Sequence, residues 1–207
     1  VWDNYPPPKF NRKWYESTDI IASISKVTHD IVSTVSPQIE SLYFPHSVDS
    51  NFFKPLEEAE ILELREQSNI DKDKFVVFWN NRNARRKHPA TLIHWFNDFL
   101  NKVGRDKAQL IMHTDPYDPN GPNLVAVVDN LGLVNGEVKF SKGRLDFPQM
   151  ASLYNMCDVT VNISDAEGFG LSTLESLSCG TPIIVNMTGG LQEQVTDGEN
   201  WFGIGIE

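Results

Sequence analysis

The sequence predicts an α/β fold in which a parallel sheet has helices on both faces. Short apolar runs that suit buried strands alternate with longer segments of helical apolar spacing. In addition, the apolar run 159–163 passes through a glycine turn directly into a helical segment, as at the carboxyl end of a parallel strand. Parallel strands need such crossover helices, so we expect an open sheet wound on both sides.

The first third of the chain contains few such elements. Residues 1–17 are rich in Pro, Asn and aromatic side chains and indicate irregular structure. We expect a strand at 19–25, a helix at 26–35 and a second strand at 39–44. His46 lies in the following turn and is interpreted as a linker or hinge residue. The acidic segment 56–67 predicts a helix with a solvated charged face.

The rest of the chain alternates regularly. Strands are expected at 75–79, 108–113, 137–141, 158–163, 182–185 and 201–206, with helices at 91–103, 123–131, 147–155 and from 171 to 177. The apolar stripe of the helix at 91–103 indicates core packing rather than a cofactor site. The aspartates of the loop 115–122 are explained by turn chemistry.

Composition excludes several classes of function. A net charge of −10 and a pI near 4.9 argue against nucleic acid or an anionic membrane as a partner, because both require clustered positive charge. Cys157 and Cys179 form no disulfide framework and no metal spacing, which indicates a reducing compartment. With no signal-like start and no apolar run of about 18 residues, we expect a cytoplasmic protein without a transmembrane segment. Because the sequence opens at Val1, we expect a piece of a longer polypeptide.

The stretch 164–193 is the centre of the functional prediction. The strand at 158–163 leads through Gly168, Phe169 and Gly170 into a helix, whose first amides face any ligand at the strand end. Glu167 and Glu175 bracket this turn, and because helical side chains lean toward the N-terminus, both can face one pocket.

Two common phosphate-binding motifs do not fit this stretch. A nicotinamide-cofactor fingerprint requires a third glycine where Thr173 stands, and an acidic residue roughly 20 positions further on. A P-loop requires a lysine after the glycines, and none is present.

The same stretch resembles the E-x7-E segment of retaining glycosyltransferases of the GT-B fold, especially family 4. The resemblance includes the small-Gly-x-Pro strand start at 179–182 and the Gly-Gly-x-x-Glu turn at 189–193. It implies that 46–207 form a Rossmann-like domain that binds a nucleoside-diphosphate sugar. Residues 1–45 would be the tail of a preceding N-terminal domain and its linker, and the rest of that domain would be missing.

The resemblance also assigns roles to the loop 80–87, the only dense basic cluster of the chain. Family members usually carry an Arg and, five residues later, a Lys that bind the donor diphosphate, and Arg82 and Lys87 have this spacing. His88 stands where the family usually has a glycine. In the loop after the strand at 137–141, Lys142 and Leu145 are the expected walls of the base site.

Within the central motif, the resemblance assigns Glu167 to sugar hydroxyls near the reacting carbon and Glu175 to the ribose. The backbone of Phe169, Gly170 and Leu171 would contact sugar and phosphate oxygens. No metal is implied: the Asp-Lys-Asp at 71–73 precedes a strand, and GT-B enzymes of this type are metal-independent. The predicted catalytic residues are therefore Glu167, Arg82 and Lys87, with Gly168, Phe169, Gly170, Leu171, Glu175, Lys142 and Leu145 binding the donor.

The implied reaction transfers a hexose, with GDP-mannose favoured as donor, to an unknown sugar, glycan or lipid with retention. The chain alone is expected to bind donor without efficient transfer. Four alternatives stay open: a hydrolase acid/base pair, a purely structural Glu175, a related epimerase or phosphorylase, and a non-catalytic nucleotide-sugar module acting with a partner chain. The last is favoured by the strands near the N-terminus, whose open edges need neighbours.

Overall fold

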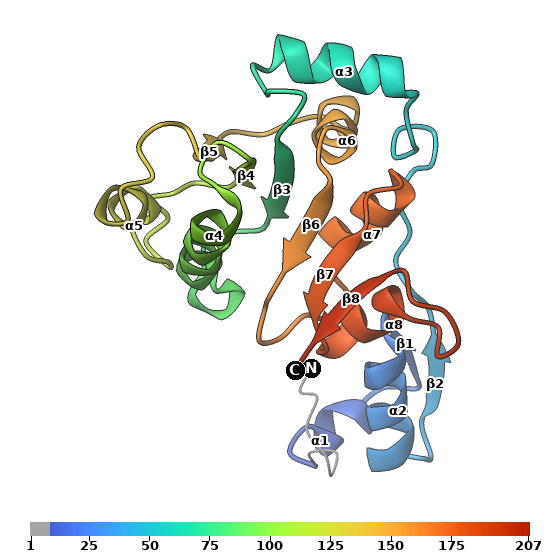
Figure 1. Cartoon of the computed structure of the whole chain (residues 1–207). Helices are drawn as coiled ribbons and strands as arrows, with labels where there is room; N and C mark the ends of the chain where they lie inside the picture. Colours follow the sequence, from blue (N-terminus) through green and yellow to red (C-terminus); the bar gives the residue numbers. More distant parts are fainter. Residues whose placement is uncertain (1–8) are drawn as a thin grey trace.

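The structure, a computed structural model, describes residues 9–207 and contains two parallel sheets (Figure 1). The smaller sheet pairs β1 (Ile20–Ser23) with β2 (Glu40–Tyr43). The larger has the strand order β5-β4-β3-β6-β7-β8. Its strands are β3 (Phe75–Asn80), β4 (Ala108–His113), β5 (Val138–Ser141), β6 (Val159–Asn162), β7 (Ile183–Asn186) and β8 (Gly203–Ile206). Every strand pair is parallel, so the predicted fold class is confirmed.

Helices cover the two faces of the larger sheet. The helices α4 (Pro89–Val103) and α5 (Leu124–Asn130) pack on one face, and α3 (Glu58–Gln67) and α6 (Phe147–Asn155) on the other, where α6 also contacts α7 (Leu171–Ser178) (Figure 1). Successive side chains of β3 alternate between these layers: Val77 and Trp79 join the α4 core, whereas Val76 and Phe78 join the α6 core. A strand buried on both faces explains the nearly continuous apolar run at 75–79.

The elements that differ from prediction are short or lie at helix starts. Helix α4 begins at Pro89, two residues before the predicted start, because proline suits the first turn of a helix. Four single turns were not predicted: α1 (Arg12–Tyr15), η1 (Arg85–Lys87), η2 (Gly189–Leu191) and α8 (Gln192–Val195). The prediction of irregular structure for 1–17 is therefore wrong at α1, and its first eight residues lie outside the described part of the chain.

The small sheet and its helix α2 (Lys26–Val35) lie beside the carboxyl ends of β6 and β7 (Figure 1). The backbone amide of Lys26, at the start of α2, donates to Glu193 Oε2 at 2.8 Å. The ring of His46, which follows the small sheet, packs edge-on against Phe169 with centroids 5.2 Å apart. The segment from β1 to His46 therefore contributes directly to the surroundings of the glycine turn. Within residues 9–207, no helix is both long and apolar enough to span a membrane.

Candidate functional site

Two loops meet at the carboxyl ends of β3 and β6. The β3–α4 loop carries the basic cluster, and the β6–α7 loop carries Glu167. Lys87 Nζ forms an ion pair with Glu167 Oε2, and Arg86 Nη1 donates to the carbonyl of Ala166 at 2.5 Å. His88 Nε2 lies 2.6 Å from Asp165 Oδ1. Three polar contacts therefore hold the β3–α4 loop against the part of the β6–α7 loop that precedes the glycine turn.

The Lys87–Glu167 pair is largely withdrawn from water. The Lys87 side chain is 6% exposed and that of Glu167 is 15% exposed. Burial holds the pKa of Lys87 below its usual range, although the carboxylate of Glu167 opposes this shift. A buried cation of this kind needs an anion beside it, because removal of either charge leaves the other unpaired.

Glycine is required where the turn enters α7. Gly170 has φ of 92° and forms the N-cap of α7, a conformation that side chains with a Cβ rarely adopt. The backbone of Gly189 and Gly190 packs directly against this turn. A Cβ at Gly189 would lie 1.7 Å from the carbonyl oxygen of Glu167. The Gly-Gly-x-x-Glu segment therefore packs against the Glu167 backbone and restricts its position.

The first pocket at this edge is termed the α7 pocket and has a volume of about 460 Å³. Its lining consists of residues 167–172, Glu175, Asn80, Asn81, Ile24 and His46. Glu167 and Glu175 thus line one pocket. Burial raises the pKa of Glu175, and the hydrogen bond that it accepts from the hydroxyl of Tyr154 opposes the rise.

The second pocket is termed the β4 pocket and has a volume of about 640 Å³. It is lined by residues 80–82, residues 113–115, Asp118, Lys142 and Gly143. Asn80 and Asn81 line both pockets, which are therefore neighbours. Two buried polar atoms of this lining, Asn81 Nδ2 and Thr114 Oγ1, have no hydrogen-bond partner among residues 9–207.

Several side chains of the β4 pocket already have partners in this structure. Arg82 Nε lies 2.7 Å from Asp118 Oδ2, and this guanidinium holds the pKa of Asp118 far below its usual range. Lys142 Nζ lies 5.3 Å from the centroid of the Tyr117 ring, within cation–π range. His113 Nδ1 is 2.9 Å from Ser141 Oγ, and burial lowers the pKa of His113.

Comparison with known proteins places this edge in context. The family described as "Glycosyl transferases group 1" matches residues 60–205, which is well over half of the chain. The chain belongs to this family. The matched range includes both loops, both glutamates and all seven residues predicted to bind the donor.

Curated relatives of this group 1 glycosyltransferase chain are distant but cover most of it. A D-inositol 3-phosphate glycosyltransferase of Catenulispora acidiphila is 26% identical over 86% of this chain and 43% of its own length. The GDP-mannose-dependent alpha-(1-6)-phosphatidylinositol monomannoside mannosyltransferase of Mycolicibacterium smegmatis is 26% identical, over 91% of this chain and 49% of its own. The chain thus spans about half the length of these relatives.

Solved structures share the fold of the chain. Sucrose-phosphate synthase from Thermosynechococcus elongatus matches with a TM-score of 0.76 and 25% identity, over 95% of this chain and 47% of its own. Anabaena HepE, solved with UDP and glucose, matches with a TM-score of 0.73 and 22% identity, over 96% of this chain and 53% of its own.

The predicted site residues of this group 1 chain lie in four different places. Glu167, Glu175 and the turn from Gly168 to Leu171 line the α7 pocket, whereas Arg82 and Lys142 line the β4 pocket. Lys87 lies between the loops as the partner of Glu167. Leu145 is half-buried and lies outside the lining of both pockets. The two predicted cations therefore point to different places in this structure.

Several pocket residues were not predicted. His46 was interpreted as a linker or hinge residue without a partner, but its ring contacts Phe169 and lines the α7 pocket. No local signal could have revealed a contact across so much sequence. For Asn80, Asn81 and His113 a signal existed: polar residues where buried strands end lie at the ligand edge of a parallel sheet.

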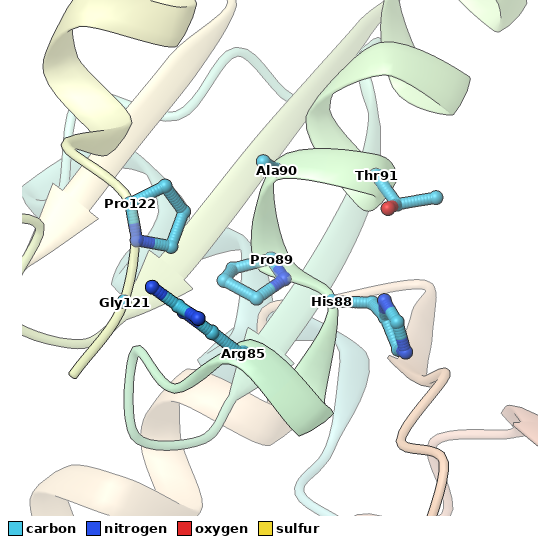
Figure 2. Close-up of a pocket in the computed structure, with 7 residues that line it drawn as sticks. All are labelled: Arg85, His88, Pro89, Ala90, Thr91, Gly121 and Pro122. Atoms are coloured by element: carbon cyan, nitrogen blue, oxygen red, sulfur yellow. The ribbon is translucent and has the colours of Figure 1, made fainter.

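A third pocket, of about 350 Å³, lies outside this arrangement at the start of α4 (Figure 2). Arg85 extends toward Pro122 and Gly121 of the β4–α5 loop, whereas the ring of His88 turns to the opposite side (Figure 2). None of the residues predicted to contact the donor lines it.

Proposed function

We propose that the chain is the donor-binding half of a retaining glycosyltransferase that transfers a hexose from a nucleoside-diphosphate sugar. The observation that carries the proposal is the α7 pocket: two glutamates, a glycine turn and a helix start converge on it, and a buried lysine pairs with one of the glutamates. Family membership supports the reaction class. The unpartnered Asn81 and Thr114 atoms support the β4 pocket as part of the same binding site.

The chemistry requires stabilisation of the leaving diphosphate. Lys87, Arg82 and the first amides of α7 are the proposed stabilisers, and one preorganised donor of this kind can contribute about 3 to 4 kcal/mol to the barrier. For this, Arg82 must exchange Asp118 for a phosphate oxygen. The Arg82 side chain is 66% exposed and that of Asp118 is 13% exposed, so the exchange breaks a pair that is open to solvent on the arginine side.

The remaining groups orient the donor. Glu167 binds sugar hydroxyls near the reacting carbon, Glu175 binds the ribose, and Lys142 with Leu145 contacts the base. The acceptor attacks from the face that the diphosphate leaves, which retains the anomeric configuration. We further propose that no metal takes part. Among the described residues, no three His, Cys, Asp or Glu side chains lie close enough to hold one ion.

GDP-mannose is the favoured donor, in accordance with the GDP-mannose-dependent relative. HepE, which was also solved with UDP-glucose, makes the uridine series the natural competitor. The acceptor is proposed to be a sugar, glycan or lipid bound largely by an N-terminal domain, whose last part is residues 1–45. We propose a cytoplasmic location for the whole protein.

Calorimetric titration of the chain with GDP, UDP and ADP, with and without EDTA, tests this function. One nucleotide series should bind whether or not EDTA is present, and Arg82→Ala and Glu175→Ala should each weaken this binding. Arg105→Ala is the matched control, because Arg105 is an exposed arginine paired with Glu137 away from both pockets. If the folded chain binds none of the nucleotides, the donor-binding assignment is wrong.

A second candidate function is a non-catalytic nucleotide-sugar module that acts through a partner chain. The small sheet favours it: within the described residues β1 and β2 pair only with each other, and Leu42 and Phe44 are exposed. Such a module would bind donor without hydrolysing or transferring its sugar, even after a matching N-terminal half is added. Recovery of transfer in that mixture would favour the enzyme.

A further inference from the structure

The hydroxyl of Tyr154 lies at the junction of the two pockets. It donates to Glu175 Oε2 at 2.7 Å and accepts from Asn80 Nδ2 at 2.8 Å. Tyr154 itself is fully buried and lines neither pocket. Its hydroxyl therefore reaches a ligand only through Glu175 and Asn80, which do line them.

The Tyr154 ring is held firmly in this position. It packs edge-on against Phe78 of β3, with centroids 5.1 Å apart, and against Phe53 at 6.3 Å. A phenylalanine would satisfy this packing equally well. The buried hydroxyl is tolerated because both of its hydrogen-bond partners are present.

We propose that Tyr154 is the positioning residue for the Glu175 carboxylate. By occupying Oε2, it turns the remaining oxygen of Glu175 toward the α7 pocket, where the adjacent hydroxyls of a ribose bind. The same hydroxyl fixes Asn80, so one side chain sets both the carboxylate and the amide that separates the pockets. This inference rests on the proposed role of Glu175 as the ribose ligand.

The proposal also predicts a change in the pH dependence of nucleotide binding, because titratable groups surround Glu175. Its titratable neighbours are Tyr154 on α6, Cys179 after α7, and Glu167 and His46, which line the same pocket. Burial raises the pKa of Glu175 and the Tyr154 hydrogen bond opposes this. Without the hydroxyl, the pKa of Glu175 rises further. Ribonucleotide binding needs the ionised carboxylate of Glu175. On acidification, a chain without the Tyr154 hydroxyl should therefore lose this affinity at a higher pH than the wild-type chain does.

The test compares GDP with 2′,3′-dideoxy-GDP in calorimetric titrations across pH, repeated with the corresponding uridine nucleotides. In the wild-type chain the ribonucleotide should bind more tightly. In Tyr154→Phe this preference should fall by about tenfold, the usual effect of one hydrogen bond to a charged group. The pH at which half of the ribonucleotide preference is lost on acidification should also be higher in Tyr154→Phe. The affinity for the dideoxynucleotide should not change. In Glu175→Gln, adding Tyr154→Phe should have no further effect on nucleotide affinity.

The outcomes separate the two proposals. If the wild-type chain prefers the ribonucleotide but Tyr154→Phe keeps the same preference and pH profile, the positioning role is overturned and the proposed function stands. If the wild-type chain binds the two nucleotides equally well, Glu175 is not the ribose ligand and the positioning role falls, while the donor-binding assignment stands. If it binds neither nucleotide, the donor-binding assignment falls as well. Should Tyr154→Phe fail to fold, Asn80→Ala, which frees the hydroxyl to rotate, must also reduce the ribonucleotide preference.

Discussion

Two ion pairs stand at opposite ends of the strands β3 and β6, and they differ in what surrounds them. At the amino ends, Arg65 pairs with Asp158 at 2.9 Å, while its Nε donates to the carbonyl of Met156 at 2.8 Å. Asp158 also accepts from the backbone amide of Val76 at 2.6 Å. At the carboxyl ends, Lys87 pairs with Glu167, which is part of a pocket lining. The Arg65 pair also borders a pocket, of about 490 Å³, and its Asp158 side chain is 37% exposed against 15% for Glu167. The two pairs therefore differ less in exposure than in the number of fixed acceptors around the cation.

The two cations differ in whether a ligand could replace their acceptors. The guanidinium of Arg65 spreads its donors over several fixed acceptors, so a ligand could replace none of them without loss. Lys87 has one main acceptor, and a phosphate oxygen could substitute for that carboxylate. We therefore expect the pair at one end of the sheet to stabilise the fold and the pair at the other end to exchange its carboxylate for a bound anion.

The largest effect is expected at the amino end. Arg65→Met leaves the Met156 carbonyl without its donor and Asp158 without its cation, although Asp158 is 37% exposed and water compensates in part. We expect the free energy of unfolding to fall by about 3 kcal/mol, measured by urea denaturation. Nucleotide affinity should not change. A loss of affinity with intact stability would contradict the structural assignment.

A smaller but more informative effect is expected for Glu167→Gln. The amide keeps the shape but leaves the charge of buried Lys87 uncompensated, and stability should fall by about 1 to 2 kcal/mol. Pyrophosphate should then raise the melting temperature of Glu167→Gln more than that of the wild-type chain, because the anion supplies the negative charge that the amide lacks beside Lys87. Asp158→Asn is the matched control and should gain no more from pyrophosphate than the wild-type chain does. Equal gains in both variants would mean that the two ends do not differ as described.

The sequence predicted the elements of the fold better than the directions of the site residues. Helices α2 and α6 begin and end where expected, because apolar spacing was supported by the caps Ser25 and Asp146. The shared pocket of Glu167 and Glu175 also followed from helix geometry alone. Single turns such as α8 carry too few residues to show a period.

Long-range contacts explain what could not be predicted. Arg82 turns to Asp118, thirty-six residues away, so it does not stand beside Lys87 as the five-residue spacing suggested. Tyr154 lay within the helix predicted at 147–155 without any assigned role, and only the packing of α6 against α7 brings its hydroxyl to Glu175. Spacing along one element fixes which face a residue occupies. Which side chain it meets depends on another element.

Asp118 offers a test of the exposed cation. Asp118→Asn removes the carboxylate that competes with a phosphate for Arg82. Because the arginine of this pair is open to solvent, we expect nucleoside-diphosphate affinity to rise by only about two- to threefold. Titration calorimetry at low and high salt measures this. The gain should shrink at high salt, because screening weakens the competing pair. A loss of affinity would indicate that Asp118 itself contacts the nucleotide.

The smallest effect concerns acid stability. Arg82 holds the pKa of Asp118 far below its ordinary value of 3.8. A carboxylate with a depressed folded pKa stabilises the protein above its unfolded pKa, and this contribution is lost as the pH falls below about 4. Denaturation curves between pH 5 and pH 2 should therefore show a shallower decline for Asp118→Asn than for the wild-type chain. An unchanged decline would point instead to carboxylates such as Asp197, whose pKa is lowered to about 2 by hydrogen bonds from Asn200 and from the backbone. That result would mean that the Arg82–Asp118 pair contributes too little free energy to compete with a phosphate for Arg82. Arg82 would then bind a phosphate as readily as we expect for Lys87.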